Sequence, residues 1–552
     1  MRRTRLVAIL LAGLLAACAG SRASPTPSPN LSADAQVRLR PLTPPVQPCN
    51  NTFVTRPLDY TTLAAVRPVG LYESNGAGLA VGDLDDDGDQ DIVMANLGGP
   101  NTILWNEGRF RWRAEELSHG GSRGVTIVDV DGDGDLDIVF TLRGDRPSFF
   151  RNVGTPEAPR FEPGQLPDVN NPFYTINWAD LEGDGDLDLV AASYDADLLK
   201  QQGLIFTQRG GVGVFVYERE GETYLQHRLA DAADALAIAL PDIDGDGRRD
   251  IWVGNDFIRP DGVWLWRNGG WAAATPFDSI TENTMSLDLG DVDNDGVPEL
   301  FAADMKPYAK DAATMARWLP MMKKMTMPMS ADDPQHAENV LLVRGADGRW
   351  RNQGYERMVD STGWSWSAKF GDLDRDGYLD LYVVNGMIAE GLFDHLPNHE
   401  LVEANMVLRN NGRGTFHPMP EWGLGSTSSG RGMSMADFDG DGDLDIVVNN
   451  LESPAQLFEN RLCGGENLLV DLRWPESANT RAIGAELRLH TSAGTFLRDV
   501  RAASGYLSGD SSQVHFGIPP GATIEGLTIT WPDGAVSEVT GLVPQTQVTV
   551  TR

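Results

Sequence analysis

The sequence predicts an all-β protein, a seven-bladed β-propeller followed by a small C-terminal β-sandwich-like domain. Three observations support this fold class. An acidic loop recurs seven times, every copy precedes an apolar run of strand length, and several copies are followed by a third strand, an Asn/Gly turn and a fourth strand. Because propeller blades are four-stranded sheets repeated around an axis, we predict a propeller over residues 49–463 and the second domain over 464–552.

The acidic loop has the pattern Asp-x-Asp-x-Asp-Gly-x-x-Asp, with Glu replacing Asp at two places, and its sixth position is Gly in all seven copies. We predict that the carboxylates at positions 1, 3, 5 and 9 are metal ligands. They are Asp83, Asp85, Asp87 and Asp91; Asp129, Asp131, Asp133 and Asp137; Asp180, Glu182, Asp184 and Asp188; Asp242, Asp244, Asp246 and Asp250; Asp291, Asp293, Asp295 and Glu299; Asp372, Asp374, Asp376 and Asp380; and Asp437, Asp439, Asp441 and Asp445.

A hard cation explains the spacing of these carboxylates. Oxygens at positions 1, 3, 5 and 9, with a backbone carbonyl at 7, can surround Ca²⁺, while Gly permits the sharp turn at 6. Without a cation, the clustered carboxylates would repel one another. A solvated Asp/Gly-rich turn is the alternative, but it does not account for seven copies in register. We therefore expect about one Ca²⁺ per blade, up to seven.

The residue at position 12 separates these loops from EF-hands, which need a bidentate Glu there and a helix on each side. Position 12 is apolar in every copy: Met94, Phe140, Ala191, Val253, Ala302, Val383 and Val448. The runs that follow the loops are apolar and of strand length, at 92–95, 138–140, 189–192, 251–253, 300–303, 381–384 and 446–448. Such runs indicate strands that are covered on both faces, so each loop is expected to connect two strands.

The seventh repeat lacks a fourth strand, because Cys463 and two glycines follow its third strand. Residues 51–58 resemble the entry to a fourth strand at 106–113. We predict that this N-terminal strand completes the last blade, which also removes an exposed sheet edge. Cys49 and Cys463 are then expected to form a disulfide beside the junction; two free thiols are the alternative.

The N-terminus has the layout of a bacterial lipoprotein signal peptide over residues 1–18, with basic residues, an apolar run and a lipobox-like Leu-Ala-Ala-Cys. Cys18 would carry the lipid; an ordinary signal peptide with an incidental Cys is the alternative. Residues 19–48 are rich in Pro and Ser and are expected to be an extended, unpacked tether. We expect an exported protein, anchored only by lipid to a bacterial membrane, with the outer membrane or cell surface as its site.

Composition narrows the choice of partners and chemistry. The formal net charge of −34 argues against nucleic acid. A Met-rich insertion over 305–338 holds seven Met between Met305 and Met329, which favours an apolar packing or partner-contact role over the alternative of Cu(I) binding. No motif of a catalytic nucleophile or of a phosphate-binding loop is present in the sequence, so no catalytic and no cofactor-binding residue other than the calcium ligands is assigned.

With loops, strands and turns in place, the chain resembles the FG-GAP/VCBS repeat family, whose blades are similar to those of integrin α-type propellers and bind calcium in the same loop. It resembles in particular the bacterial members of the cartilage acidic protein-like family, which end in an ASPIC/UnbV domain. The residues that carry this second resemblance are 479–485, 505–506, 515–517 and 531–534. The resemblance implies architecture and calcium binding, and it assigns no activity.

We therefore expect a calcium-binding, membrane-anchored extracytoplasmic scaffold that binds an unidentified protein or glycan, and no enzyme. One alternative is a hydrolase or lyase that acts on polysaccharide or lipid at the central channel, because propellers do host catalysis. Another alternative is an accessory subunit of a larger envelope complex. Carboxylates outside the calcium loops that converge at the channel mouth would favour the enzyme.

Overall fold

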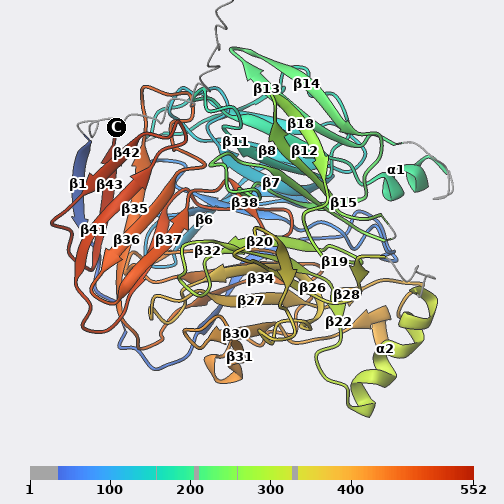
Figure 1. Ribbon diagram of the computed structural model, residues 1–552. Helices are drawn as coiled ribbons and strands as arrows, with labels where there is room; N and C mark the ends of the chain where they lie inside the picture. The colour runs from blue at the N-terminus through green and yellow to red at the C-terminus, as the bar shows by residue number, and fades with distance from the viewer. Residues whose placement is uncertain (1–34, 46, 157, 204–210, 258, 326–332) are drawn as a thin grey trace, which may run out of the picture.

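The computed structural model describes residues 35–45, 47–156, 158–203, 211–257, 259–325 and 333–552 (Figure 1). These residues fold mostly into antiparallel sheets, with two α-helices, α1 (Asp195–Gln201) and α2 (Ala312–Met325). The signal peptide and Cys18 lie outside the described residues. Among the helices of the described part, none combines the length and apolar character needed to cross a membrane.

One four-stranded antiparallel unit recurs along the chain, and an acidic loop joins its first two strands. The units are β3 (Leu79–Gly82), β4 (Asp91–Met94), β5 (Pro100–Asn106) and β6 (Trp112–His119); β7 (Ser122–Val128), β8 (Asp137–Leu142), β9 (Ser148–Asn152) and β10 (Phe161–Gly164); β11 (Thr175–Ala179), β12 (Asp188–Ala192), β13 (Val214–Glu220) and β14 (Thr223–Ala230); β15 (Ala235–Ala239), β16 (Ile251–Asn255), β17 (Gly262–Arg267) and β18 (Gly270–Ala274); β20 (Ser286–Gly290), β21 (Glu299–Ala303), β24 (Val340–Arg344) and β25 (Trp350–Asn352); β26 (Gly363–Gly371), β27 (Asp380–Asn385), β30 (Met406–Asn410) and β31 (Phe416–Pro418); and β32 (Gly430–Ala436), β33 (Asp445–Asn450) and β34 (Pro454–Glu459) with β2 (Val54–Thr61).

The apolar runs form these strands because each sheet is covered on both faces. Successive side chains of a strand point to opposite faces. In the first unit, Leu79 packs with Val447 and Leu457 of the last unit, whereas its neighbour Ala80 packs with Ile127 of the second unit. The first strands of successive units also contact one another, as β20 does with β15 and with β26. The units are thus arranged around a common axis, as in a propeller.

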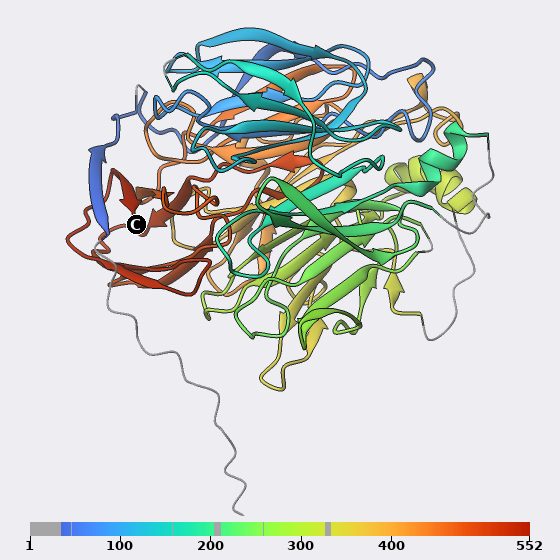
Figure 2. The same cartoon turned by 90° about the horizontal axis from the view of Figure 1, so that it is seen from above.

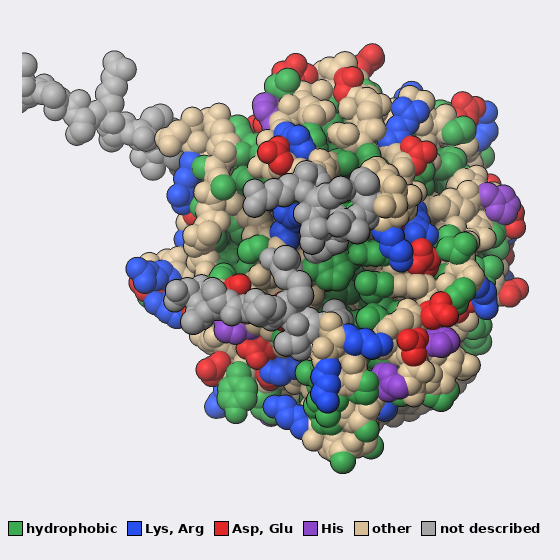
Figure 3. Space-filling model, turned by 90° about the vertical axis from the view of Figure 1, so that its right-hand side faces the viewer, with side chains coloured by type: hydrophobic (Ala, Val, Ile, Leu, Met, Phe, Trp, Pro, Cys, Tyr) green, Lys and Arg blue, Asp and Glu red, His purple; other side chains and the backbone are tan. Residues whose placement is uncertain are grey.

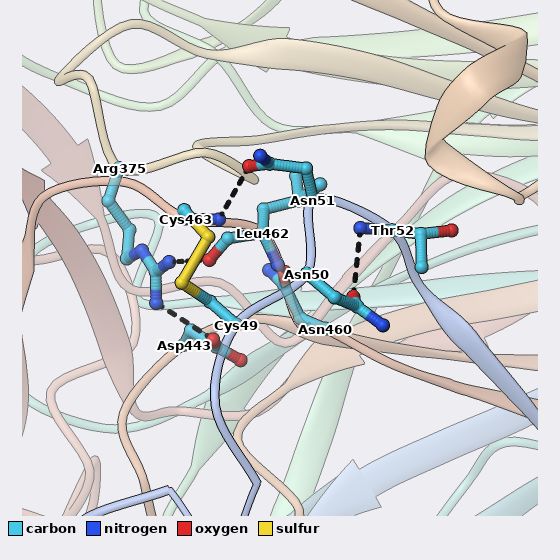
Figure 4. The surroundings of a disulfide bond; sticks show 9 residues. All are labelled: Cys49, Asn50, Asn51, Thr52, Arg375, Asp443, Asn460, Leu462 and Cys463. Atoms are coloured by element: carbon cyan, nitrogen blue, oxygen red, sulfur yellow. Dashed lines mark hydrogen bonds and ion pairs between the residues drawn. A yellow bond between two sulfur atoms is a disulfide. The ribbon is translucent and has the colours of Figure 1, made fainter.

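The last unit is completed by the N-terminal strand, as the sequence predicts. β2 pairs antiparallel with β34 from Val54 to Thr61. Cys49 and Cys463 form the predicted disulfide, with their Cα atoms 5.1 Å apart. Beside it, Arg375 donates to an oxygen of Asp443 at 2.8 Å and to the carbonyl of Leu462 (Figure 4).

The C-terminal domain consists of two four-stranded sheets that pack on a shared core. One sheet has the order β1 (Gln36–Pro41), β43 (Thr546–Thr551), β35 (Glu466–Arg473) and β40 (Val514–Ile518), and the other has the order β37 (Gly494–Asp499), β36 (Glu486–Thr491), β41 (Ile524–Thr530) and β42 (Val536–Val539). Residues 36–41 therefore differ from the predicted unpacked tether. They pair with β43 because that edge of the sheet offers free backbone groups, although all six side chains are exposed.

One segment of the C-terminal domain, the axial segment 503–509, enters the middle of the repeat units. It contains β38 (Ala503–Ser504) and β39 (Ser508–Gly509), and β39 pairs in parallel with both β3 and β7. In Figure 1, β38 lies among the central strands, away from the main body of its domain at the left. The axis of the propeller-like ring is therefore filled by residues of the same chain.

The fully buried side chain of Tyr506 lies in this axial segment. Its hydroxyl oxygen lies 2.6 Å from that of Tyr174 and accepts the N–H of Gly76 at 3.1 Å, and its ring packs edge-on against Trp366 with centroids 5.0 Å apart. The chain on both sides of Tyr506 is held too, because Gly505 donates to the carbonyl of Leu287 at 2.8 Å and Ser508 accepts the N–H of Met433 at 3.1 Å. Hydrogen bonds and ring packing from several innermost strands thus hold this segment in place.

The two helices lie on the side away from the C-terminal domain, where apolar side chains gather near the middle of the face (Figures 2 and 3). Helix α2 belongs to the Met-rich insertion, and Asp311 caps it by accepting the N–H groups of Ala313 and Thr314. Met321 is buried in a core cluster with Trp318, a packing role; Met327 and Met329 lie outside the described residues. Short elements complete this region: β19 (Ile280–Thr281) with β23 (Gln335–His336), β22 (Met305–Lys306) beside β26, β28 (Met387–Ile388) with β29 (Glu400–Leu401), and the 3₁₀ turns Pro397–His399 and Pro420–Trp422.

Candidate calcium loops

The seven acidic loops share one backbone arrangement, and we number them along the chain from the first (83–91) to the seventh (437–445). In every loop the position-1 carboxylate accepts the N–H of the Gly at position 6, at 2.9 to 3.1 Å. That Gly has φ between 87° and 101° in all seven loops, a backbone conformation that side chains with a Cβ rarely adopt. The hydrogen bond from position 6 to the carboxylate of position 1 therefore bends the loop into a compact turn, as a cation site requires.

The position-9 carboxylate holds the loop to its own sheet. In every loop it accepts the N–H of position 2, at 2.8 to 3.2 Å. In six loops its other oxygen accepts a backbone N–H at the end of the third strand, at 2.7 to 3.2 Å. These backbone donors fix the orientation of the carboxylate. The sequence predicted a ligand at this position, and the structure adds a positioning role.

In the first, second, fourth, fifth and sixth loops, three of the four predicted ligands converge. In five groups, three carboxylates of one loop each offer an oxygen within 4.8 Å of the others; the groups are Asp83, Asp85 and Asp91; Asp129, Asp131 and Asp137; Asp242, Asp244 and Asp246; Asp291, Asp293 and Asp295; and Asp372, Asp374 and Asp376. At the third position of four loops, a buried oxygen has no hydrogen-bond donor in the described part of the chain: Asp85 Oδ1, Asp244 Oδ1, Asp293 Oδ1 and Asp374 Oδ1. Glu182 Oε2 of the third loop is in the same state. Because orphaned buried oxygens are costly, a hard cation that prefers oxygen ligands fits these sites.

Burial and mutual repulsion disfavour the charged form of these carboxyls when no metal is bound. Burial, together with the charges of Asp86 and Asp87, raises the pKa of Asp83 to about 7. Burial likewise raises the pKa of Asp137 and of Glu299 to about 8. A bound cation would replace the protons that the metal-free loops hold near neutral pH.

Arginines at the outer rim of several loops were not predicted. Arg267 contacts Asp244 at 3.1 Å, Arg357 contacts Asp293 at 2.9 Å and Arg409 contacts Asp374 at 2.5 Å, always at the oxygen other than the orphaned one. Each of these three arginines neutralises one oxygen and leaves the orphaned oxygen without a donor among the described residues. Arg151 differs, because it pairs with the buried Oδ2 of Asp131 itself in the second loop. Three of the four arginines share a signal in the sequence, because Arg151, Arg267 and Arg409 each stand directly before an Asn at the end of a third strand.

Asparagines at the ends of third strands link neighbouring loops, although their sequence pattern indicated only turn residues. The side-chain amide of Asn106 donates to the carbonyl of Phe438, Asn410 donates to Val292 and Asn460 donates to Leu373, at 2.6 to 2.9 Å. Each acceptor is position 2 of a loop in the preceding unit. We call these three residues the loop-bridging asparagines; they tie the acidic loops into one layer.

The C-terminal domain covers the loop side of the ring. A cavity of about 880 Å³ lies between them, lined by Asp180, Asp242, Asp291 and Asp372, each the first residue of a loop, and by Arg498 and Trp531 of the C-terminal domain. Five acidic side chains of this cavity lie outside the loops, and all are ion-paired: Asp288 and Asp499 with Arg501, Asp510 with Lys369, Glu486 with Arg488 and Asp533 with Arg552. Burial raises the pKa of Asp288 although Arg501 opposes it, whereas Lys369 and Arg501 outweigh burial at Asp510 and lower the pKa of that carboxyl.

The sequence matches two protein-family models. The FG-GAP-like repeat matches residues 83–140, 129–191, 242–302 and 400–448, and the ASPIC and UnbV model matches residues 475–552. No curated protein matches the chain significantly.

Several solved structures are similar at low scores. BBS1N in complex with ARL6DN aligns with a TM-score of 0.39 at 10% identity, over 74% of this chain and 97% of that chain. The WD40 domain of coronin from Toxoplasma gondii has a TM-score of 0.38 at 10% identity, over 76% and 89%. A mutant of AofleA from Arthrobotrys oligospora has 0.36 at 11% identity, over 68% and 95%.

Proposed function

This chain carries FG-GAP-like repeats and a C-terminal ASPIC and UnbV domain, and on that premise we propose that it is a calcium-binding scaffold, lipid-anchored to a bacterial membrane outside the cytoplasm. Calcium ions in the acidic loops hold the strand connections rigid. The surface so stabilised binds a protein or a glycan. In this proposal the repeat units are seven blades of one propeller, closed by β2 and by the Cys49–Cys463 disulfide.

The observation that carries the calcium proposal is the orphaned oxygen at position 3. It is buried beside two further carboxylates of its loop, which themselves accept the N–H groups that shape the loop. The carboxylates of positions 1, 3 and 5 would hold the ion, with position 9 supplying the last side-chain oxygen. A bound Ca²⁺ supplies charge neutralisation and a cross-link within the loop.

Two features of the axis support a binding role over catalysis at a central channel. The axial segment 503–509 occupies the middle of the ring, with Tyr506 fully buried there. Acidic side chains that line the loop-side cavity form ion pairs, as Asp288 and Asp499 do with Arg501 and Asp510 does with Lys369. A general acid needs a proton to exchange at its working pH, and the lowered pKa of Asp510 opposes this role.

The placement of β1 supports one orientation at a membrane. β1 lies on the edge of the C-terminal domain, so a lipid on Cys18 would connect to the molecule through that domain. The face that carries α1 and α2 is then left for a partner. Its apolar centre, with charged side chains around it, suits a protein or glycan surface (Figure 3).

Removal of calcium tests the proposed function. We expect that the protein in excess EDTA melts at least about 5 °C below the protein in 1 mM calcium, because one site at 100 times its Kd already contributes about 2.7 kcal/mol. Magnesium is the control; it binds poorly to sites that need more than six oxygens. Differential scanning calorimetry gives the melting temperatures, and equal values in EDTA and calcium would refute the calcium proposal.

The lipid anchor has an independent test. Mass spectrometry of the protein from the native membrane fraction should find an N-terminal peptide that begins at Cys18 and carries acyl chains. The Cys18→Ser variant should lose this peptide, and Cys49→Ser, which alters a cysteine far from the cleavage site, should keep it. A mature N-terminus without lipid in the unaltered protein would contradict the anchor.

A further inference from the structure

Residues 473–481, which we call the docking segment, join β35 to β36 in the C-terminal domain and lie against the first three acidic loops. Arg473 contacts Asp86 of the first loop at 3.0 Å. The N–H of Asn479 donates to the carbonyl of Gly185 in the third loop at 2.8 Å, and the Ser477 hydroxyl donates to the same carbonyl. One short segment therefore depends on the shapes of several loops at once.

Thr480 makes the contact with a predicted calcium ligand. Its hydroxyl donates to Asp129 Oδ2 at 2.5 Å, and this residue is only 7% exposed. The same oxygen of Asp129 accepts the N–H of Gly134, and its other oxygen accepts the N–H groups of Gly132 and Asp133. Asp129 is thus oriented by its own loop and by a second domain.

The rest of the docking segment fixes Thr480 in place. The backbone carbonyl of Thr480 accepts the N–H of Trp474 at 2.8 Å, and Asn479, which is fully buried, closes the turn by bonding the backbone of Ile483 in both directions. Arg481 spans two loops, with its guanidinium 3.6 Å from Asp86 and donating to the carbonyl of Gly134 at 3.2 Å. The hydroxyl of Thr480 is therefore presented to Asp129 by a rigid turn.

We propose that the C-terminal domain completes the second calcium loop through Thr480, a positioning residue for Asp129, so that calcium binding there and docking of the segment 473–481 stabilise each other. This inference rests on the proposed calcium binding. It makes the C-terminal domain a part of a metal site whose ligands all come from the repeats.

The physical reason is that the partners of a metal ligand fix its orientation. Loss of such a partner typically weakens metal binding by about 10- to 100-fold. Coupling between two events is reciprocal, so whatever the docked segment adds to calcium affinity, calcium adds to docking. The loop and the docking segment should therefore respond to calcium at one concentration.

Hydrogen exchange followed by mass spectrometry across a calcium titration resolves the loops from one another. In the unaltered full chain, peptides over 129–137 and 473–481 should gain protection with a common midpoint. The Thr480→Val variant keeps the shape of the side chain and removes the hydroxyl, and it should shift the midpoint of both peptides to about 10-fold higher calcium. In the fourth loop (242–250), the first carboxylate, Asp242, accepts backbone N–H groups of its own loop in the described residues, so this loop should keep its midpoint as an internal control.

Two further variants separate the hydroxyl from other effects of substitution. Thr480→Ser retains the donor and should restore the midpoint of the second loop. Thr523→Val, an exposed Thr of the same domain, should leave all midpoints unchanged. If Thr480→Val leaves the second loop at its normal midpoint, the inference is refuted while calcium binding stands. If calcium protects none of the loops in the unaltered chain, the proposed function itself fails.

Discussion

A loop-bridging asparagine forms several buried hydrogen bonds through one side chain. Asn410 is fully buried; its amide donates to the carbonyls of Val292 and Leu379, and its side-chain oxygen accepts the N–H groups of Gly412 and Gly414. Because it joins the sixth unit to the fifth loop, it couples two loops that are far apart in sequence. Replacing it would leave several buried backbone groups without a partner, and each such group costs about 1–3 kcal/mol.

We predict that Asn410→Ala lowers the free energy of unfolding in saturating calcium by about 2–4 kcal/mol, measured by urea denaturation. The matched control is Asn411→Ala, at the exposed neighbouring position, where water can replace the lost hydrogen bonds. The control should change stability by less than about 1 kcal/mol. Equal effects of the two substitutions would mean that Asn410 does not bridge the loops in solution.

At the scale of elements, the spacing of apolar residues and acidic loops predicted the positions of strands. The strands after the acidic loops lie where the apolar runs lie, as for β4, and the closing strand β2 was visible because it resembles another fourth-strand entry. The sequence did not predict the contacts that the loops make with other elements. The Asn at the end of a third strand has the same local context in any turn, and its acceptor, such as Val292 for Asn410, lies in another unit.

Two elements escaped prediction for the same reason. Strand β1 lies in a Pro-rich stretch, and its exposed Val37 and Leu39 have no burial pattern to mark a strand; it forms because β43 offers an edge. The axial segment was visible only as a Gly-Tyr pair. Its place in the ring follows from hydrogen bonds to Gly76, Leu287 and Met433, which come together only in the folded chain.

At the scale of the whole molecule, the C-terminal domain and the repeats act as one body. A single core cluster contains Val128 and Phe173 of the repeats together with Leu487 and Trp531 of the C-terminal domain. The acidic loops lie between the two, so their charge affects the interface as well as each loop. Repulsion among these carboxylates should therefore appear in the stability of the entire protein, in a way that depends on pH and on calcium.

The raised pKa values fix the sign of that dependence in the metal-free protein. Burial raises the pKa of Asp91, Asp137 and Glu299 to about 8, whereas an unfolded chain titrates these groups near 4. Between pH values of about 4 and about 8, the folded state thus binds more protons than the unfolded state. The free energy of unfolding therefore falls as the pH rises through about 8. His515, whose pKa burial lowers to about 3, opposes folding only below about 6.5, the ordinary pKa of histidine, so a pH range of 6.5 to 8.5 isolates the carboxyls.

We predict that the melting temperature of the metal-free protein falls from pH 6.5 to about 8 and then levels off. The melting temperature of the calcium-bound protein should change little, because the cation has replaced the protons. The stabilisation by calcium should therefore grow with pH. Calorimetry of protein dialysed free of metal, with and without added calcium, measures both curves. A metal-free melting temperature that stays constant or rises over this range would show that the loop carboxyls are already ionised and relaxed without calcium. Repulsion among the loop carboxylates would then not destabilise the metal-free protein, and calcium would have no such repulsion to relieve.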